Sequence, residues 1–275
     1  MVELPDGEGV PALGQGTWNI GDDAANRAAE IDALRYGIDL GLTLIDTAEM
    51  YGDGRAETVV GEAIAGRRDG VFIVSKVLPN NASKRGTLAA CEASLRRLKT
   101  DRIDLYLLHW RGSVPFAETL EAFVALRRAG KIRHYGVSNL DLSDLQEWWH
   151  GAGGAATATN QLLYNLTRRG IEWDLLPWLR EKKIPLMAYS PLEQARLLRN
   201  SALKDFAKNH GMTPAQVALA WLLENKDVMV IPKSGDRARV RENAAAREIR
   251  LTAAQRAELD RLFAPPQGPR SLEML

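Results

Sequence analysis

Four side chains able to move protons or hold charge lie at or near the ends of short apolar runs. Asp46, Lys76 and His109 each end such a run, and Tyr51 follows shortly after Asp46. The gaps from Asp46 to Lys76 and from Lys76 to His109 are about 30 residues, roughly one strand–helix unit each. The carboxyl ends of parallel strands in an α/β barrel meet at one face, where barrel active sites lie. Side chains of these types at that face favour general acid–base chemistry.

Each of these residues also has an ordinary interpretation when it is considered alone. Asp46 could begin a loop, Lys76 could extend to solvent, and His109 and Tyr51 could be core residues whose polar atoms are satisfied. The ordinary interpretations fit poorly together, because a buried ammonium needs a partner and Asp46 on the neighbouring strand would supply one. Tyr51 would then fold back over the same opening.

The elements that must position these side chains alternate regularly along the chain. Continuous apolar runs rich in β-branched residues predict strands buried on both faces, at residues 12–16, 42–46, 71–75, 103–108, 132–137, 155–160, 184–189 and 228–231. Amphipathic patterns predict helices at residues 23–40, 55–66, 84–98, 116–129, 141–149, 172–182, 201–209, 213–224, 236–245 and 252–263. Thr213 and Thr252 are the expected N-caps of the helices at residues 213–224 and 252–263.

Eight strand–helix units favour an α/β fold of the (β/α)8 barrel type over an open doubly wound sheet. The turn sequence Leu4-Pro-Asp-Gly, followed by Val10, predicts a short N-terminal β-hairpin. Residues 265–275 contain three prolines and are expected to form a loop. We therefore predict a single barrel domain over residues 1–275.

Composition limits the classes of partner. The chain is 45% hydrophobic and 26% charged with a net charge of +1, which gives no reason to expect a nucleic-acid or membrane partner. Cys91 is the only cysteine, so an internal disulfide is excluded and a thiol-based metal site is not expected. The N-terminus lacks a signal-peptide pattern, and no apolar run approaches about 20 residues. We expect a cytoplasmic monomer that binds no metal.

The sequence resembles the aldo-keto reductases, and within them bacterial reductases of the methylglyoxal and diketogulonate type. The resemblance extends from Leu4 to about Phe263. It rests on ordered motifs with the spacing of βα units: Asp46-Thr-Ala-Glu-Met-Tyr51-Gly, Ser75-Lys76, Leu107-Leu-His109-Trp, Gly136-Val-Ser-Asn139, Asn160-Gln161, Tyr189-Ser-Pro-Leu192, and Ile231-Pro-Lys-Ser234 with Arg239 and Glu242-Asn243.

The resemblance implies that small aldehydes or ketones are reduced by hydride from C4 of the nicotinamide of NADPH. It implies that Tyr51 is the general acid, that Lys76 lowers the pKa of Tyr51, and that Asp46 holds Lys76 charged and oriented. It implies further that His109 donates a hydrogen bond to the carbonyl oxygen. Trp18, Tyr51, His109 and Trp110 would line the substrate pocket.

The resemblance also implies a cofactor site in the barrel opening. Two cations, Lys233 and Arg239, suit a 2′-phosphate and favour NADPH over NADH. The chain has no Gly-x-Gly-x-x-Gly, so a Rossmann site is not indicated. The expected cofactor-binding residues are Gly16, Thr17, Trp18, Asp46, Ser138, Asn139, Gln161, Tyr189, Ser190, Pro191, Leu192, Ile231, Pro232, Lys233, Ser234, Arg239, Glu242 and Asn243.

The sequence departs from the family pattern at two places. Glu193-Gln194 stands where many members have glycine after Ser-Pro-Leu, and Gly235-Asp236 replaces commoner residues. The short segments after His109 and Leu192 and the short tail beyond Phe263 indicate an open substrate pocket.

Two other functions stay open on the same fold. A cofactor-binding regulatory subunit would bind nicotinamide cofactor without turnover. Barrel isomerases and hydrolases need a carboxylate base or metal ligands at strand ends, where this chain offers one Asp and one His.

Overall fold

The apolar runs form one sheet of eight parallel strands in the computed structural model, which describes residues 1–275. Each strand pairs with its neighbour in the chain, in the order β10-β9-β8-β7-β6-β5-β4-β3. The strands are β3 (Gln15–Gly16), β4 (Leu44–Asp46), β5 (Phe72–Val77), β6 (Ile103–Leu108), β7 (Ile132–Ser138), β8 (Thr157–Leu163), β9 (Leu186–Tyr189) and β10 (Val228–Val230). Sequential parallel pairing requires a crossover between every two strands, which the helices supply.

The two edges of this curled sheet lie against each other. Isolated parallel bridges join Leu13 to Val230 and Gly16 to Lys233. The approach is close at Gly16, where an added Cβ would lie 2.8 Å from the carbonyl oxygen of Ile231. The missing side chain of Gly16 therefore lets the first strand reach the last, and the sheet has the arrangement expected of a (β/α)8 fold.

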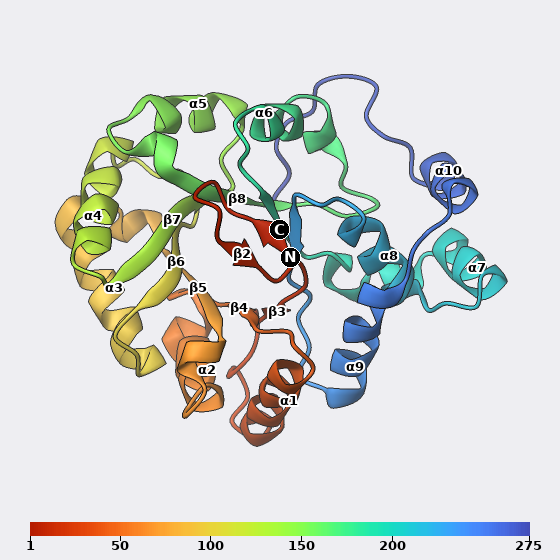
Figure 1. Ribbon diagram of the computed structural model, residues 1–275, viewed down its shortest axis with the longest axis horizontal. Coiled ribbons are helices and arrows are strands. Elements are labelled where there is room, and N and C mark those ends of the chain that lie inside the picture. The colour runs from red at the N-terminus through yellow and green to blue at the C-terminus, as the bar shows by residue number, and fades with distance from the viewer.

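Helices surround the sheet, and Figure 1 shows them as a ring outside the strands. They are α1 (Arg27–Asp39), α2 (Arg55–Ala63), α3 (Lys84–Leu98), α4 (Phe116–Arg128), α5 (Leu142–His150), α6 (Leu175–Glu181), α7 (Ser201–Asn209), α8 (Pro214–Leu223), α9 (Arg237–Ala245) and α10 (Ala253–Leu262). The expected caps are confirmed, because Thr213 and Thr252 each form a capping box with the Gln three residues later. The 3-10 segments are η1 (Tyr51–Gly54), η2 (Arg68–Gly70), η3 (Pro79–Asn81), η4 (Gly154–Ala156), η5 (Gly170–Glu172), η6 (Glu193–Ala195), η7 (Leu197–Arg199) and η8 (Ala246–Glu248).

Several predicted boundaries were wrong. Helix α1 begins at Arg27 rather than at residue 23, and α6 begins at Leu175 after the 3-10 turn η5. Strand β8 continues to Leu163, so Gln161 lies within a strand and not after it. The polar residues Asn160 and Gln161 concealed the last part of the strand, since a polar side chain inside a barrel opening breaks the apolar pattern without breaking the strand.

Two separate apolar clusters fill the fold. The larger contains 59 buried residues and lies between the sheet and the helices. The smaller contains the inward-facing residues of the strands and three hairpin residues: Val2, Leu4, Val10, Leu44, Phe72, Val74, Leu105, Leu107, Ala158, Met187, Met229 and Ile231. A separate inner cluster is what a curled sheet with a side-chain-filled interior produces.

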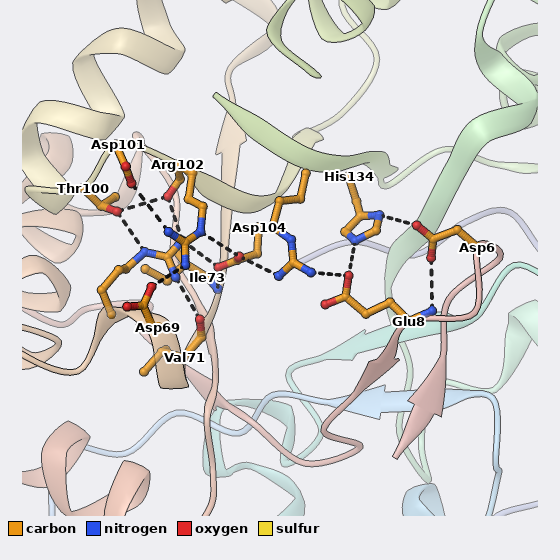
Figure 2. A network of polar contacts seen from close by, with 12 residues as sticks. Asp6, Glu8, Asp69, Val71, Ile73, Thr100, Asp101, Arg102, Asp104 and His134 are labelled. Carbon is orange, nitrogen blue, oxygen red and sulfur yellow. Dashed lines mark hydrogen bonds and ion pairs between the residues drawn. The ribbon is translucent and has the colours of Figure 1, made fainter. Parts of the chain in front are cut away.

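The predicted N-terminal hairpin is confirmed and lies against the interior of the sheet. Its strands β1 (Val2–Glu3) and β2 (Gly9–Val10) pair antiparallel, and Figure 1 shows it inside the ring of strands. Its turn is held by His134, whose Nε2 lies 2.8 Å from Glu8 Oε2 and whose Nδ1 lies 3.3 Å from Asp6 Oδ2 (Figure 2). These contacts join the hairpin to the amino end of β7.

The same network continues into the amino ends of β5 and β6 (Figure 2). Asp104, which is 1% exposed, accepts hydrogen bonds from the backbone N–H of Ile73 at 2.8 Å and from Arg133 Nη1 at 3.1 Å. Arg68 Nη2 lies 2.8 Å from Asp104 Oδ2, the oxygen that also accepts from Ile73. The buried charge is therefore paired and hydrogen-bonded, and this face of the sheet has the character of a structural face rather than of a site.

None of the helices combines the length and the apolarity that crossing a membrane requires.

Candidate active site

Four of the predicted residues meet at the carboxyl ends of three neighbouring strands. Lys76, in β5, places Nζ 2.8 and 2.9 Å from the two carboxylate oxygens of Asp46, at the end of β4. The same Nζ lies 3.2 Å from Tyr51 Oη and 2.9 Å from the carbonyl oxygen of Thr47. His109 follows β6, and its ring centre lies 5.9 Å from that of Tyr51. All four residues are buried, Lys76 with 0% of its surface exposed.

Strand alternation explains why these side chains point inward. Leu44, Val74 and Leu107 belong to the inner apolar cluster, and side chains two residues apart on a strand face the same side. Asp46, Lys76 and His109 therefore continue these inward rows at the end where the apolar filling stops. Polar groups there replace the last layer of the core.

A break in strand pairing turns Gln161 toward the same place. The register between β7 and β8 shifts between Tyr135 and Val137, which allows Ala158 and Gln161 to face inward although strict alternation forbids it. Gln161 Nε2 donates to Asp46 Oδ1 at 2.7 Å. The side chain that was expected to hold the cofactor amide thus also fixes the Asp46 carboxylate.

A second group fixes the backbone of Asp46. Thr17 Oγ1 donates to the Asp46 carbonyl oxygen at 2.9 Å, and Gly16 pairs with Asp46 in the β3–β4 ladder. The predicted residues Gly16 and Thr17 therefore lie beside the cluster. Their observed contacts orient Asp46, which in turn orients Lys76.

Burial perturbs the ionisation of both members of the ion pair. It lowers the pKa of Lys76, and the Asp46 carboxylate opposes this by favouring the ammonium. Burial likewise raises the pKa of Asp46, and Lys76 opposes that shift. Each charge thus offsets part of the desolvation cost of the other, as expected for a buried pair.

The net shift of the Tyr51 pKa is upward, so the expected lowering by Lys76 does not set its direction and stays a prediction. Burial raises the pKa of Tyr51 well above its ordinary value, and the charge of Asp46 raises it further. Tyr51 is therefore a neutral hydroxyl at every ordinary pH, and it carries a proton that it can donate.

His109 is held as a neutral imidazole. Burial, with a smaller contribution from the Lys76 charge, lowers its pKa to about 2. Its Nδ1 atom is buried and has no hydrogen-bond partner in the protein. An imidazole that cannot become charged can still donate or accept one hydrogen bond at each nitrogen according to its tautomer.

The four expected substrate-pocket residues lie side by side. The ring of Trp18 meets that of Tyr51 edge-on at 5.0 Å, and the ring of Trp110 lies 4.7 Å from that of His109. Trp18 is 42% exposed. Aromatic side chains thus border the Tyr51 hydroxyl on the solvent side of the buried ion pair.

The residues expected beside the nicotinamide form a hydrogen-bonded chain around the opening. Asn139 Nδ2 donates to Ser138 Oγ and to the His109 carbonyl oxygen, both at 3.1 Å, and Asn139 Oδ1 accepts from Tyr189 Oη at 3.0 Å. Ser138 Oγ donates to the carbonyl oxygen of Gln161 at 2.9 Å. The structure brings all four together and gives each an internal partner.

The residues expected at the adenosine end lie at the other side of the opening. Pro232 to Ser234 connect β10 to the cap of α9, and Arg239, Glu242 and Asn243 lie on α9 itself. Arg237 on the same helix is already engaged, since it pairs with Asp32 and covers the ring of Tyr36 at 4.2 Å. The side chains of Lys233 and Arg239 are exposed and make no ion pair, so two free cations remain beside a helix N-terminus.

Sequence reasoning missed the residues that hold the loop after β9, where Ser190, Pro191 and Leu192 lie. Glu193 is 4% exposed and accepts hydrogen bonds from Arg168 and Asn165. The departure of Glu193 from the family glycine was the only signal in the sequence, and nothing pointed to Arg168. The short tail also covers more of the opening than its length indicated, because the Leu275 N–H donates to Tyr189 Oη at 3.4 Å.

Comparisons with known proteins agree with this geometry. Residues 12–264 match the model of the aldo/keto reductase family. The chain is 53% identical to methylglyoxal reductase YeaE of Escherichia coli over 100% of this chain and 99% of that protein. It is 34% identical to glyoxal reductase of Bacillus subtilis over 100% and 97%.

A solved structure is also closely similar. The aldo/keto reductase of Klebsiella pneumoniae in complex with NADP and acetate superposes with a TM-score of 0.97 at 52% identity, over 100% of this chain and 99% of that one. A fold that matches over its full length, a family match that spans nearly all of the chain, and relatives well above 30% identity agree with one another. The chain belongs to the aldo-keto reductase family.

Proposed function

We propose that this protein is an NADPH-dependent reductase of small aldehydes and ketones, an oxidoreductase of CH–OH groups, with Tyr51 as its general acid. The observation that carries the proposal is the buried contact of Lys76 Nζ with both Asp46 oxygens and with Tyr51 Oη at 3.2 Å. A tyrosine hydroxyl held at a lysine inside an aromatic-bordered opening is suited to giving a proton to a carbonyl oxygen.

The roles of the four residues follow from their contacts. Tyr51 donates its proton from Oη to the carbonyl oxygen as that oxygen gains negative charge. Lys76 orients Oη and stabilises the tyrosinate that remains, and Asp46 holds Lys76 in place. His109, which stays neutral, donates a hydrogen bond to the same carbonyl oxygen and sets the position of the substrate.

The donor set fits the cofactor that related structures contain. Lys233 and Arg239 are free of internal ion pairs and lie at the start of α9, where backbone N–H groups and the helix dipole favour an anion. Ser138, Asn139, Gln161 and Tyr189 would hold the nicotinamide, Ser190 to Leu192 the pyrophosphate, Lys233, Ser234 and Arg239 the 2′-phosphate, and Glu242 and Asn243 the adenine side. When bound, NADPH supplies the hydride that reduces the carbonyl carbon.

The names of the relatives guide the choice of substrate. Proteins 53% and 34% identical to this chain are a methylglyoxal reductase and a glyoxal reductase. Trp18 and Trp110 border Tyr51 and His109. Small dicarbonyls such as methylglyoxal are therefore the first substrates to assay.

The test is steady-state loss of NADPH absorbance with methylglyoxal, for the wild type and for Tyr51→Phe. We expect turnover by the wild type and a loss of about a hundredfold or more in Tyr51→Phe, since general acid catalysis contributes roughly that much. NADPH binding should be nearly unchanged. Tyr106→Phe is the matched control, because Tyr106 is equally buried, lies on the outer side of β6, and has an unpartnered hydroxyl.

Wild-type turnover by Tyr51→Phe would refute the role of Tyr51. A wild type that quenches its fluorescence on binding NADPH but reduces no carbonyl would instead indicate the regulatory-subunit alternative, which no observation favours at present.

We also infer that residues 1–275 form one closed barrel domain, supported by the bridges between its edge strands. The predictions of a monomer and of a cytoplasmic location are retained. Sedimentation equilibrium tests the first, and fractionation of cells that express the protein tests the second.

A further inference from the structure

The loop after β9 has an unusual backbone. Glu193, Gln194 and Ala195 have φ values of +52°, +51° and +67°, and Ser190 has a φ of +46°. L-amino acids enter this left-handed region as single residues and rarely in succession. Such a segment persists only where its surroundings over-determine it. Something outside the loop must therefore hold it.

The buried carboxylate of Glu193 ties the loop to two side chains outside it. Its Oε1 accepts from Arg168 Nε at 3.0 Å and Nη2 at 2.8 Å, and its Oε2 accepts from Asn165 Nδ2 at 2.8 Å. Arg196 adds one longer contact, at 3.1 Å. These charges lower the pKa of Glu193 below its ordinary value although burial acts in the opposite direction. Asn165 Nδ2 also donates to the Ser190 carbonyl oxygen at 3.0 Å, so both ends of the loop are tied to one turn.

Arg168 has a second partner on a distant part of the chain. Its Nη1 donates to the carboxylate of Glu273 in the C-terminal tail. Beyond α10 this tail has no helix or strand and is mostly exposed, and a cavity of about 200 Å³ separates part of it from the start of α5 and from Ile171. Beyond Phe263, which belongs to the core, side-chain packing of the tail rests mainly on Leu272. The Arg168–Glu273 contact is therefore one of the few contacts that hold the tail against the rest of the protein.

The end of the tail reaches the centre of the opening. The Leu275 N–H contacts Tyr189 Oη at 3.4 Å, and Tyr189 in turn donates to Asn139. Burial raises the pKa of Tyr189 to about 12, although the hydrogen bond from the Leu275 N–H acts in the opposite direction. The tail thus ends beside the site, while the loop fixed by Glu193 lies where the pyrophosphate is expected.

We propose that Arg168 is a positioning residue that joins the loop after β9 to the C-terminal tail, and so couples the expected pyrophosphate side of the opening to the side where the tail contacts Tyr189. The proposal rests on the proposed function for the assignment of those two sides. One guanidinium can do this because its fork presents several donors in fixed directions, two to Glu193 and one to Glu273. A lysine cannot reach both carboxylates in that way.

The test separates the contact of Arg168 with Glu193 from its contact with Glu273. Arg168→Met removes both contacts, and Glu273→Gln weakens only the contact with the tail. Arg196→Met is the matched control, since Arg196 contacts the same oxygen of Glu193, is exposed, and has no link to the tail. For each variant, NADPH affinity is measured by fluorescence quenching, kcat and the KM for methylglyoxal by steady-state kinetics, and the melting temperature by circular dichroism.

We expect a split between the two variants. Arg168→Met should weaken NADPH binding about tenfold, the size of effect that one charged hydrogen bond supplies, and should also raise the methylglyoxal KM. Glu273→Gln should raise only the KM, by about fivefold, with kcat, NADPH affinity and melting temperature nearly unchanged. Arg196→Met should change neither constant by more than about twofold. Arg168→Lys, which keeps the charge and so protects folding, should restore NADPH affinity but not KM.

A lower melting temperature in Arg168→Met with unchanged NADPH affinity and KM would overturn the proposal, because Arg168 would then be only structural. An unchanged KM in Glu273→Gln would overturn the link to the tail. The measurement of NADPH affinity needs no turnover. A failure of the proposed reductase activity is therefore recognised separately, by a wild type that binds NADPH and reduces nothing.

Discussion

His109 should make the stability of the protein depend on pH between about 5 and 8. Its pKa in the folded state is lowered from 6.5 to about 2, chiefly by burial. Below pH 6.5 the unfolded chain therefore binds a proton that the folded chain refuses, so the free energy of unfolding falls as the pH is lowered toward 2. At about pH 5 the imidazole of the unfolded chain is almost fully protonated, because this pH lies 1.5 units below its ordinary pKa of 6.5. At 1.36 kcal/mol per unit, the loss relative to pH 8 is about 2 kcal/mol.

The assay is urea unfolding of the wild type and of His109→Gln at about pH 8 and about pH 5, followed by circular dichroism. The glutamine variant should lose about 2 kcal/mol less between the two pH values, because a neutral amide cannot be protonated. Other histidines and the carboxylates titrate equally in both proteins and cancel in the difference. His150→Gln is the control, since His150 is exposed. An identical pH dependence for the wild type and His109→Gln would refute the argument that burial keeps this imidazole neutral.

Two further predictions concern the cofactor and the sheet. The double variant Lys233→Ala, Arg239→Ala should weaken NADPH binding about tenfold or more and leave NADH binding nearly unchanged, because only the 2′-phosphate loses its charged partners. Arg237→Ala is the control and should change neither affinity, since the Arg237 side chain is already paired with Asp32. If the double variant lost equal affinity for NADPH and NADH, these two residues would have no role at the 2′-phosphate. Gly16→Ala should lower the free energy of unfolding by about 1–3 kcal/mol, because its Cβ would lie 2.8 Å from a carbonyl oxygen after β10. Gly70→Ala is the control, as nothing lies within 4 Å of the added Cβ, and equal unfolding curves for the two variants would contradict the close approach at the sheet edge.

The sequence alone determined the architecture and most of the residues around the opening. Apolar runs alternating with amphipathic helices predicted eight strands in parallel, and a parallel sheet needs only local patterns and right-handed crossovers to define its order. Because parallel strands end at one face, Asp46, Lys76 and His109 could be placed together without knowledge of any contact. The boundaries of strands that contain polar residues were harder to predict, as the extension of β8 through Gln161 shows.

The tertiary structure decided how those residues act on one another. The direction of the Tyr51 pKa shift depends on the depth of burial and on the nearby charge of Asp46, and no motif contains either of them. Gln161 faces Asp46 only because a register shift in β8 breaks the alternation. Arg168 has no recognisable motif, since its partners Glu193 and Glu273 are far from it in the chain and from each other. Sequence patterns report short-range periodicity, whereas charge coupling and loop anchoring arise from contacts between distant segments that exist only once the chain is folded.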